Sequence, residues 1–232
     1  MNWFITGTDT GAGKTFVTCA LLHAFARIGV RAIAMKPLAA GLAERDGVAM
    51  NEDVALLQSA MGGNAPPLSV INPYALEDPT APHIAAARAG LRLELGPIED
   101  AYRQARALAE VVLVEGVGGW CLPLNERQWL ADIPKALDLP VLMVAGIRLG
   151  SLNHALLTAR AVVADGCRLA GWVANVLDPD YPYAAETIDT LAGHLGSPPL
   201  ATVGWSRESD SRKASVDLEG AVRRLRSDEA GK

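Results

Sequence analysis

The chain has 232 residues, half of them hydrophobic and a fifth charged, which is typical of a globular protein with room for one α/β domain and a substantial core. Its formal charge of −5 argues against a general nucleic-acid binder, which would be basic. No apolar run approaches a membrane span, and a strand pattern begins too early for a leader peptide. Three widely spaced cysteines indicate reduced thiols, so we expect a cytoplasmic protein. From the charge and the short apolar runs we expect neither nucleic-acid nor membrane partners.

The first predicted strand ends at Gly7, and a glycine-rich turn leads from it into a helical pattern. Strand, turn and helix in this order predict a phosphate-binding loop, because backbone N–H groups of the turn and the start of the helix attract a phosphate. Lys14 is expected to face solvent in the empty loop and to reach the β- and γ-phosphates, and Thr15 to place its hydroxyl on Mg²⁺. Thr8 stands where the usual spacing has a glycine. The turn reads Thr8-Asp9-Thr10-Gly11-Ala12-Gly13-Lys14-Thr15.

Beyond this turn, helical and strand patterns alternate along the chain. Helices are expected at residues 13–28, 52–61, 83–89, 98–109, 129–137, 151–164 and 183–195. Strands are expected at residues 31–35, 111–115, 141–145, 169–175 and 200–203. Because helices that connect successive strands make those strands parallel, we predict a single α/β domain over residues 1–206. Its expected architecture is a doubly wound, mainly parallel sheet with helices on both faces, similar to a P-loop NTPase.

Residues 207–232 form a charged C-terminal tail, which we expect to be a solvated end element. Three arginines in it are the only indication of an attraction to membranes: Arg223, Arg224 and Arg226. Four apolar residues have the spacing of a short amphipathic helix: Leu218, Ala221, Val222 and Leu225.

Three polar side chains end predicted strands, at the edge where parallel sheets place their sites: Lys36, Glu115 and Asn175. Glu115 follows four apolar residues, where a carboxylate needs either a metal or a cation in a structural ion pair. Asp53 lies near a helix start, where a capping or first-turn acid is the simpler interpretation. Lys36 is either an exposed lysine or a group that faces a ligand beside the turn at residues 39–41.

A further predicted helix begins near Ser151, directly after Gly150. The free N–H groups and the dipole of such a helix start can bind an anion. The alternative is a self-capped helix, in which Ser151 or Asn153 is the cap.

Six motifs, taken together in this order and spacing, resemble dethiobiotin synthetase over residues 2–206. The phosphate loop by itself is shared with many ATPases, whereas the full set is specific. The motifs are Gly7-Thr8-Asp9-Thr10-Gly11-Ala12-Gly13-Lys14-Thr15, Lys36-Pro37, Asn72-Pro73-Tyr74, Pro79-Thr80-Ala81-Pro82-His83, Val114-Glu115-Gly116-Val117-Gly118-Gly119 and Gly171-Trp172-Val173-Ala174-Asn175.

This resemblance implies an ATP-dependent step of biotin synthesis, in which CO₂ and 7,8-diaminononanoate give dethiobiotin, ADP and phosphate. One amine becomes a carbamate, ATP phosphorylates the carbamate, and the second amine attacks the mixed anhydride to close the ureido ring. Such chemistry depends on positioning and charge neutralisation more than on covalent help from the protein. The family also implies a homodimer whose sites lie at the interface, with the helix start near Ser151 holding the substrate carboxylate.

The same resemblance assigns roles to individual residues. Lys14 and Lys36 are the implied catalytic groups, and Lys36 stabilises the carbamate and the transferring phosphoryl group. The implied Mg²⁺ ligands are Thr15, Asp53 and Glu115. The implied ATP site, in which Asn175 reads the adenine edge, comprises Gly11, Ala12, Gly13, Lys14, Thr15, Phe16, Asp53, Glu115, Gly116, Val117, Gly118, Asn175, Val176, Gly204, Trp205 and Ser206. The implied diamine site comprises Thr10, Lys36, Ala40, Gly118, Gly150, Ser151, Leu152 and Asn153.

The sequence departs from the family at two positions. The family commonly has a serine where this chain has Ala40, so Ala40 can contribute only its backbone to the substrate. It commonly has a proline where this chain has Gly204, before Trp205 and Ser206, which changes the loop expected beside the adenine.

Two other classes of protein have a similar phosphate loop. A switch ATPase of the partition and cell-division type is similar in fold, and the basic trio would suit a membrane contact. Such proteins usually carry a lysine at the place of Asp9, and Asp217 and Glu219 add negative charge to the tail, which weighs against this alternative. An amide ligase of the cobyrinate type adds a glutaminase domain, for which we expect no room in 232 residues.

Overall fold

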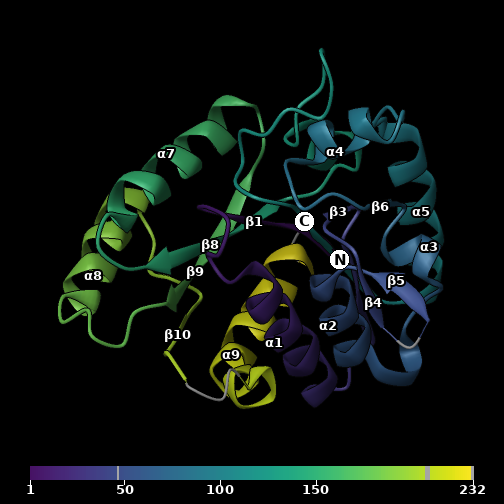
Figure 1. The fold of residues 1–232 in the computed structure, drawn as a ribbon. Helices are drawn as coiled ribbons and strands as arrows, with labels where there is room; N and C mark the ends of the chain where they lie inside the picture. Colours follow the sequence, from purple (N-terminus) through teal and green to yellow (C-terminus); the bar gives the residue numbers. More distant parts are fainter. Residues whose placement is uncertain (46, 207–209, 231–232) are drawn as a thin grey trace.

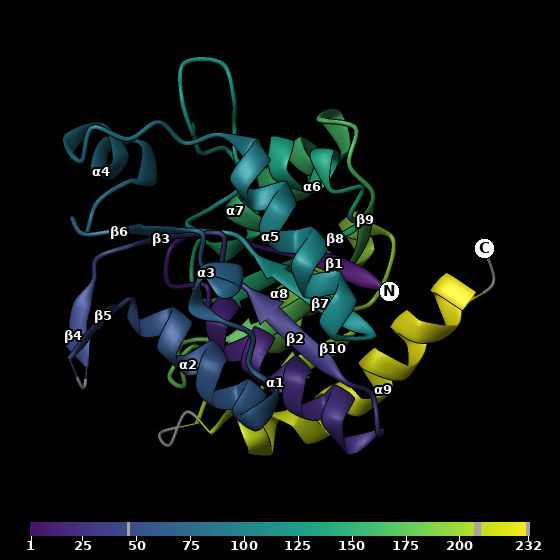
Figure 2. The ribbon, with the colours of Figure 1, turned by 90° about the vertical axis from the view of Figure 1, so that its right-hand side faces the viewer.

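A parallel sheet in the strand order β10-β9-β8-β1-β7-β2 forms the middle layer of the protein (Figure 1). The structure is a computed structural model, and it describes residues 1–45, 47–206 and 210–230. Figures 1 and 2 show helices α1, α2 and α9 on one face of the sheet and α5, α6, α7 and α8 on the other. The predicted doubly wound α/β architecture is therefore confirmed.

The strands of this sheet correspond to the apolar patterns of the sequence. They are β1 (Asn2–Gly7), β2 (Ala32–Met35), β7 (Val111–Glu115), β8 (Val141–Ile147), β9 (Leu169–Val176) and β10 (Ala201–Val203). The helices are α1 (Lys14–Arg27), α2 (Glu52–Met61), α3 (Leu68–Ile71), α4 (Pro82–Arg88), α5 (Leu95–Leu108), α6 (Asp132–Ala136), α7 (Ser151–Ala164), α8 (Ala184–Leu195) and α9 (Ser211–Ala230).

Residues 38–76 contain short strands that the sequence patterns did not predict. A parallel pair joins β3 (Leu38–Ala40) to β6 (Tyr74–Leu76), and an antiparallel pair joins β4 (Ala43–Arg45) to β5 (Val48–Met50). Strands of three residues are too short to show an alternating pattern, which explains why they were missed. The predicted helix at 129–137 is shorter than expected, because Asp132 accepts a hydrogen bond from the backbone N–H of Trp129 and the helix starts only at Asp132.

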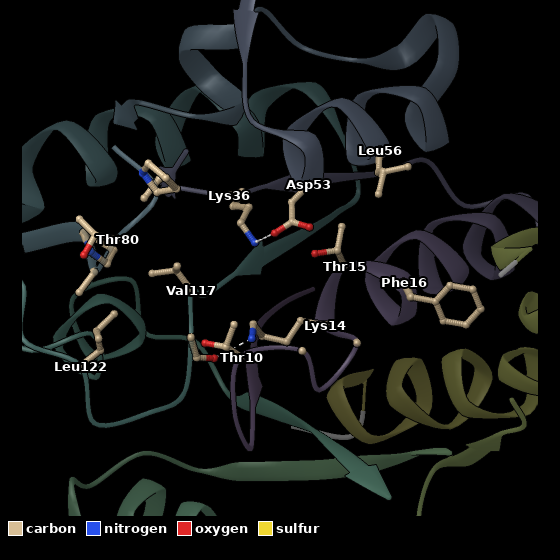
Figure 3. Close-up of a pocket in the computed structure, with 17 residues that line it drawn as sticks. Thr10, Lys14, Thr15, Phe16, Lys36, Asp53, Leu56, Thr80, Val117 and Leu122 are labelled. Atoms are coloured by element: carbon tan, nitrogen blue, oxygen red, sulfur yellow. Dashed lines mark hydrogen bonds and ion pairs between the residues drawn. The ribbon is translucent and has the colours of Figure 1, made fainter. Parts of the chain in front are cut away.

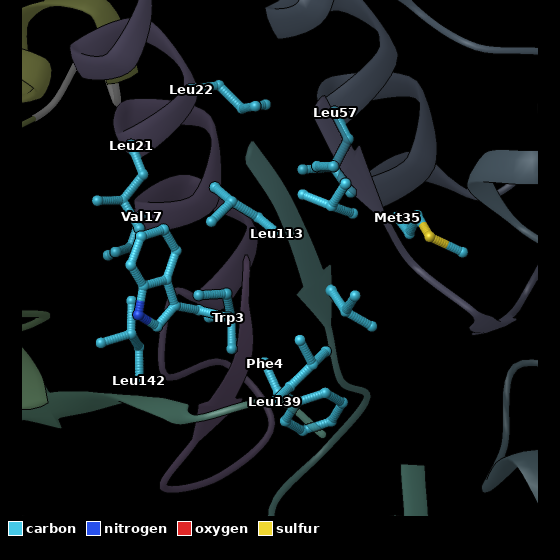
Figure 4. Packing of buried hydrophobic residues seen from close by; sticks show 14 of the residues in the cluster. Trp3, Phe4, Val17, Leu21, Leu22, Met35, Leu57, Leu113, Leu139 and Leu142 are labelled. Carbon is cyan, nitrogen blue, oxygen red and sulfur yellow. The ribbon is translucent and has the colours of Figure 1, made fainter. Parts of the chain in front are cut away.

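The centre of the core is β1, which is covered on both faces. Trp3 and Phe4 are fully buried and, as neighbours on a strand, point to opposite faces of the sheet (Figure 4). Trp3 stacks on Phe25 of α1 with ring centroids 6.1 Å apart, and Phe4 meets Trp120 edge-on at 6.2 Å. The Trp3–Phe25 contact holds the last turn of α1 against the beginning of β1, so the helix that follows the phosphate loop is packed on this face of the sheet.

The described part of the C-terminal tail packs on the core, so the expectation of a solvated end element is wrong. Its 20-residue helix α9 lies along α1, with an ion pair between Arg27 and Glu219 (Figure 1). Arg224 donates a hydrogen bond to the carbonyl of Leu200. The apolar face expected from the sequence is buried: Leu218, Ala221, Val222 and Leu225. Among the described residues, no helix has both the length and the apolar character needed to cross a membrane.

Shortening Leu218 to alanine is expected to lower the free energy of unfolding by about 2–5 kcal/mol, since the side chain is fully buried between α9 and the rest of the core. Val216 lies on the exposed side of the same helix, and Val216→Ala should change stability by less than about 0.5 kcal/mol. Chemical denaturation of both variants measures the difference. Equal stabilities would mean that α9 does not dock on α1.

Candidate functional site

The phosphate loop lies at the carboxyl edge of the sheet, between β1 and α1. Gly11 and Gly13 have φ angles of 79° and 87°, a region that side-chain-bearing residues rarely adopt. A Cβ at Gly13 would also lie 2.1 Å from the amide nitrogen of Asn175, so only glycine fits there. Gly13 caps α1 without a side-chain hydrogen bond, which leaves the first N–H groups of the helix available to an anion.

Lys14 is buried, with 7% of its surface exposed, so the expectation that it faces solvent is wrong. Its ammonium donates hydrogen bonds to the carbonyls of Gly118, at 2.6 Å, and Asp9, at 3.2 Å. Burial, together with the nearby charge of Lys36, lowers the pKa of Lys14 from 10.5 to about 8. The phosphate loop thus holds a desolvated cation whose partners are carbonyls, and an incoming phosphate would supply the missing negative charge.

Nucleotide affinity is therefore expected to depend on pH. Below pH 8 Lys14 already carries its proton, so the affinity is at its maximum; above pH 8 binding requires uptake of a proton, so the affinity falls. Between pH 7 and pH 9 the dissociation constant for Mg-ADP should rise by roughly tenfold. Titration calorimetry over this range measures the effect, and Lys14→Met should remove the slope. A slope that persists in Lys14→Met would assign it to another group.

A second buried lysine lies beside the first. Lys36 is 3% exposed, and its ammonium is 2.7 Å from Glu115 Oε1 and 2.7 Å from Asp53 Oδ2. The hydroxyl of Thr15 donates to the same oxygen of Glu115, at 2.7 Å. Thr15 of α1, Lys36 directly after β2, Asp53 of α2 and Glu115 of β7 therefore form one polar cluster at the edge of the sheet, which we call the Lys36 cluster. Figure 3 shows three of its members, Thr15, Lys36 and Asp53.

Charge neighbours determine the protonation states in this cluster. Burial alone would lower the pKa of Lys36, but the charges of Glu115 and Asp53 outweigh it and the pKa is raised. Burial would likewise raise the pKa of Asp53, yet the charge of Lys36 and hydrogen bonds from Lys36 and Thr15 lower it. Lys36 is thus held as a cation and Asp53 as an anion at neutral pH.

The structure shows which contacts Asp53 and Glu115 make. Asn51 is the N-cap of α2, since its side-chain oxygen accepts the N–H of Asp53 at 3.0 Å. Asp53 is therefore a first-turn acid whose carboxylate points to Lys36. Glu115 takes part in the ion pair, but its second oxygen, Oε2, is buried without a hydrogen-bond partner among the described residues.

These donors suit Mg²⁺, which prefers oxygen ligands and usually keeps phosphate oxygens or water in its shell. The candidate oxygens are the buried Glu115 Oε2, which has no hydrogen-bond partner among the described residues, the Thr15 hydroxyl, which donates to Glu115 Oε1, and the half-exposed Asp53 carboxylate. In the part of the chain that the structure describes, no group of three His, Cys, Asp or Glu side chains gathers, so a nucleotide would have to complete the coordination.

A pocket of about 690 Å³ runs from the phosphate loop past Lys36 to residues 79–82 (Figure 3). Eleven residues assigned from the sequence line it: Thr10, Gly11, Gly13, Lys14, Thr15, Phe16, Lys36, Ala40, Asp53, Val117 and Gly118. Six others were not assigned to the site: Leu56, Pro79, Thr80, Ala81, Pro82 and Leu122. Four of these belong to a motif that carried the resemblance, and that motif was the signal available in the sequence.

A second pocket of about 400 Å³ adjoins the first and shares Gly13, Phe16 and Leu56 with it. It contains the residues expected around adenine: Asn175, Val176, Gly204, Trp205 and Ser206. The side chain of Asn175 donates to the carbonyl of Ala12 at 3.0 Å, which ties β9 to the phosphate loop. Cys19, Leu177 and Ser211 also line this pocket and were not assigned; Ser211 is the first residue of α9.

Some assigned residues line neither pocket. Ala12 and Gly116 are packed behind the phosphate loop, and a Cβ at Gly116 would lie 2.9 Å from Phe4. The start of α7 is also outside both pockets: Gly150, Ser151, Leu152 and Asn153.

The start of α7 is not self-capped. Its N-cap is Gly150, at φ 89°, and no side chain caps it. The hydroxyl of Ser151 is buried and has no hydrogen-bond partner among the described residues. This helix start is connected to the phosphate loop through Asp9, whose carboxylate is 3.6 Å from Arg148 and 3.8 Å from His154.

A parallel sheet with a glycine-rich loop after β1, and with Lys14 and Thr15 at the start of α1, defines the class of P-loop ATPases. A family model described as an AAA domain matches residues 2–213, so the chain belongs to this family, which includes dethiobiotin synthetase.

Solved structures similar to this chain have the same fold. A chain of the MinC:MinD cell division protein complex from Aquifex aeolicus is 12% identical, with a TM-score of 0.58; the similarity covers 97% of this chain and 96% of that chain. The septum site-determining protein MinD from Pyrococcus horikoshii, complexed with Mg-ADP, is 13% identical, with a TM-score of 0.57; the similarity covers 97% of this chain and 96% of that chain. A ParA family ATPase from Chlorobium tepidum is 11% identical, with a TM-score of 0.53; the similarity covers 96% of this chain and 91% of that chain.

Proposed function

We propose that this P-loop ATPase is a dethiobiotin synthetase, which uses ATP to join CO₂ to 7,8-diaminononanoate and close the ureido ring. The observation that carries the proposal is the position of Lys36. A second buried cation stands beyond Lys14 in a pocket that continues to residues 79–82, with room for another substrate next to the phosphates. An ATPase that only hydrolyses ATP or acts as a switch needs no second substrate pocket beside the phosphates. An enzyme that transfers the phosphoryl group to a carbamate does need one.

The proposed reaction proceeds in three steps. One amine of the substrate attacks CO₂ and loses a proton, which gives a carbamate. A carbamate oxygen then takes the γ-phosphoryl group of ATP and releases ADP. The second amine attacks the carbonyl carbon of this mixed anhydride and loses a proton to solvent, and phosphate leaves with the electron pair of the C–O bond as the ring closes. Lys14 would hold the β- and γ-phosphates, and Lys36 would stabilise the charge on the carbamate and the transferred group.

Mg²⁺ is the proposed cofactor, with Thr15, Asp53 and Glu115 as its protein ligands. When bound, it would neutralise charge on the nucleotide phosphates. The Lys36 ammonium lies between the two carboxylates, so it would have to turn from them into the pocket when a metal shares them.

The direct test measures ADP release with and without diaminononanoate and bicarbonate, and identifies the product by mass. We expect ADP formation to require both additions and to match dethiobiotin one for one. ATP turnover that does not respond to the diamine would contradict the proposal, while leaving the P-loop ATPase class intact.

The shared fold with MinD and ParA family proteins favours a second candidate, an ATP-driven switch that cycles on a lipid or DNA surface. Asp9 in the phosphate loop and the packing of α9 on α1 oppose it, since the apolar face of α9 is buried in the core and is not available to insert into a membrane. Stimulation of ATP turnover by anionic vesicles or by DNA, in the absence of a diamine, would support this alternative instead.

We further propose that the protein is a homodimer and that the start of α7 holds the substrate carboxylate for the site of the partner subunit. The free helix start and the buried, unpartnered hydroxyl of Ser151 support an anion site there. Its location supports delivery to another subunit, because the described residues at the start of α7 line neither the phosphate-loop pocket nor the adjoining pocket.

Mixing two inactive variants should restore activity if this arrangement is correct. Leu152→Glu with Asn153→Glu should weaken diamine binding but spare ATP, and Lys36→Met should inactivate its own site. In a mixed dimer one site carries both defects and the other carries neither. Activity should therefore return toward half of the wild-type value per dimer. If subunit exchange is demonstrated and no activity returns, the site is not shared.

A further inference from the structure

The segment that carries Lys36 crosses the candidate site without belonging to the main sheet. It consists of residues 36–41, follows β2, and includes β3, whose partner strand is β6. Both of its ends matter to the site, because Lys36 is the centre of the polar cluster and Ala40 lines the pocket. A segment held by a three-residue strand pair needs other contacts to keep a fixed position.

A buried amide holds the first end of this segment. Asn72 is 6% exposed, and its side-chain nitrogen donates to the carbonyl of Lys36 at 2.7 Å and to the carbonyl of Tyr74 at 3.0 Å. The backbone N–H of Lys36 donates to Ile71 at 2.8 Å, and that of Tyr74 donates to Pro37 at 3.0 Å. Both hydrogens of the Asn72 amide are thus used on the two chains that meet at the start of β3 and β6.

A second amide holds the other end. The side-chain nitrogen of Asn51 donates to the carbonyls of Ala40, at 2.9 Å, and Gly41, at 3.0 Å. Its side-chain oxygen accepts the N–H of Asp53 and caps α2. One side chain therefore joins the end of the segment to the helix turn that carries the carboxylate partner of Lys36.

We propose that Asn72 and Asn51 are positioning residues of this site, which fix residues 36–41 at both ends and so place the Lys36 ammonium and the Ala40 backbone relative to Asp53 and the phosphate loop. Neither amide lines the pocket, so they act through the segment and not on the substrate. A buried lysine on a long, flexible stem reaches a fixed point only if its backbone is fixed, and small displacements of such a group reduce catalysis strongly. The predicted effect on turnover rests on the proposed function.

Two substitutions separate positioning from folding. Asn72→Ala removes both donors at the first end. Asn51→Ser keeps a good N-cap for α2 but is too short to reach the Ala40 and Gly41 carbonyls. Asn125→Ala is the matched control, because Asn125 also donates to a loop carbonyl, that of Leu93 at 2.7 Å, but lies outside the pocket. All three should lose some thermal stability.

We expect Asn72→Ala and Asn51→Ser to lower kcat for diamine-dependent ADP release by about tenfold or more, with the Kd for Mg-ADP within about twofold of wild type. Asn125→Ala should leave kcat unchanged. The inference is wrong if folded Asn72→Ala and Asn51→Ser keep the wild-type kcat. It is also wrong if Asn125→Ala lowers kcat and the affinity for Mg-ADP as much as these two variants do. Should Asn72→Ala fail to fold, Asn51→Ser decides the question.

A chemical readout tests the same inference without any assumption about the reaction. Lysine acetylation by a brief pulse of reagent, followed by mass spectrometry, gives the reactivity of Lys36 relative to the more exposed Lys135 of the same molecule. Release of the segment should raise the relative rate at Lys36 by about tenfold, since a buried amine reacts only after local opening. An unchanged rate in both variants overturns the proposal. If Lys36 is labelled faster in the two variants but the wild-type protein shows no diamine-dependent turnover, the positioning role of Asn72 and Asn51 still holds and only the proposed function is rejected.

Discussion

Lys14→Met is expected to abolish ATP turnover and to weaken Mg-ADP binding by roughly 2–5 kcal/mol, without a loss of thermal stability. Methionine fills most of the volume of the lysine, so no large cavity forms around the buried side chain. The binding energy is lost because Lys14 is a desolvated cation next to the place of the phosphates, where charge interactions are stronger than in water.

The stability of Lys14→Met should equal or exceed that of the wild type. The pKa of Lys14 is lowered to about 8, which means that the empty fold disfavours its charge. Removing the charge should therefore stabilise the nucleotide-free protein while it abolishes phosphate binding, as is common for groups positioned for function. Calorimetric melting and ADP release give the two readouts. Near-normal turnover by folded Lys14→Met would overturn the phosphate-loop assignment.

Lys36→Met should lower the free energy of unfolding by about 3–5 kcal/mol and reduce kcat by about 10²–10³-fold. Glu115 is fully buried and Lys36 is its only cationic partner among the described salt bridges, so the substitution leaves an uncompensated charge in the core. Asp53 is 42% exposed on its side chain and can be solvated instead, so it contributes little to this loss.

The double variant Lys36→Met with Glu115→Gln tests this cause. Glutamine is neutral and can still accept the Thr15 hydroxyl, so most of the stability should return while turnover stays lost. Lys135→Met, which breaks an exposed pair with Asp132, is the control and should change stability by less than about 1 kcal/mol. If the double variant is as unstable as Lys36→Met alone, packing and not charge explains the loss.

Most of the main sheet was predictable from local patterns. The strands at residues 111–115 and 141–145 are apolar runs bounded by polar or turn residues, which is how a strand buried on both faces appears in a sequence. The small strands at residues 38–50 and 74–76 were not predictable from an alternating pattern, because each has only three residues. In addition, β3 pairs with β6 across more than thirty positions of the chain, whereas β4 and β5 form a local antiparallel pair.

The candidate site was predictable in its residues but not in its contacts. Lys36, Asp53 and Glu115 were each ambiguous as single residues, and only the fold shows that they meet at 2.7 Å. The burial of Lys14 and the vacant oxygen of Glu115 are likewise tertiary facts, since solvent exposure depends on which elements cover a residue.

Local spacing along the chain was sufficient to define the class of this protein, because a phosphate loop needs its glycines, lysine and threonine at fixed local spacing and its backbone conformation follows from them. It also determined which residues of α9 face inward, through their helical period. The docking of α9 on α1, and the hydrogen bonds by which Asn72 and Asn51 hold the two ends of residues 36–41, became visible only in the three-dimensional structure. Such contacts join residues remote in the chain, and whether they form depends on the burial and geometry of the complete fold.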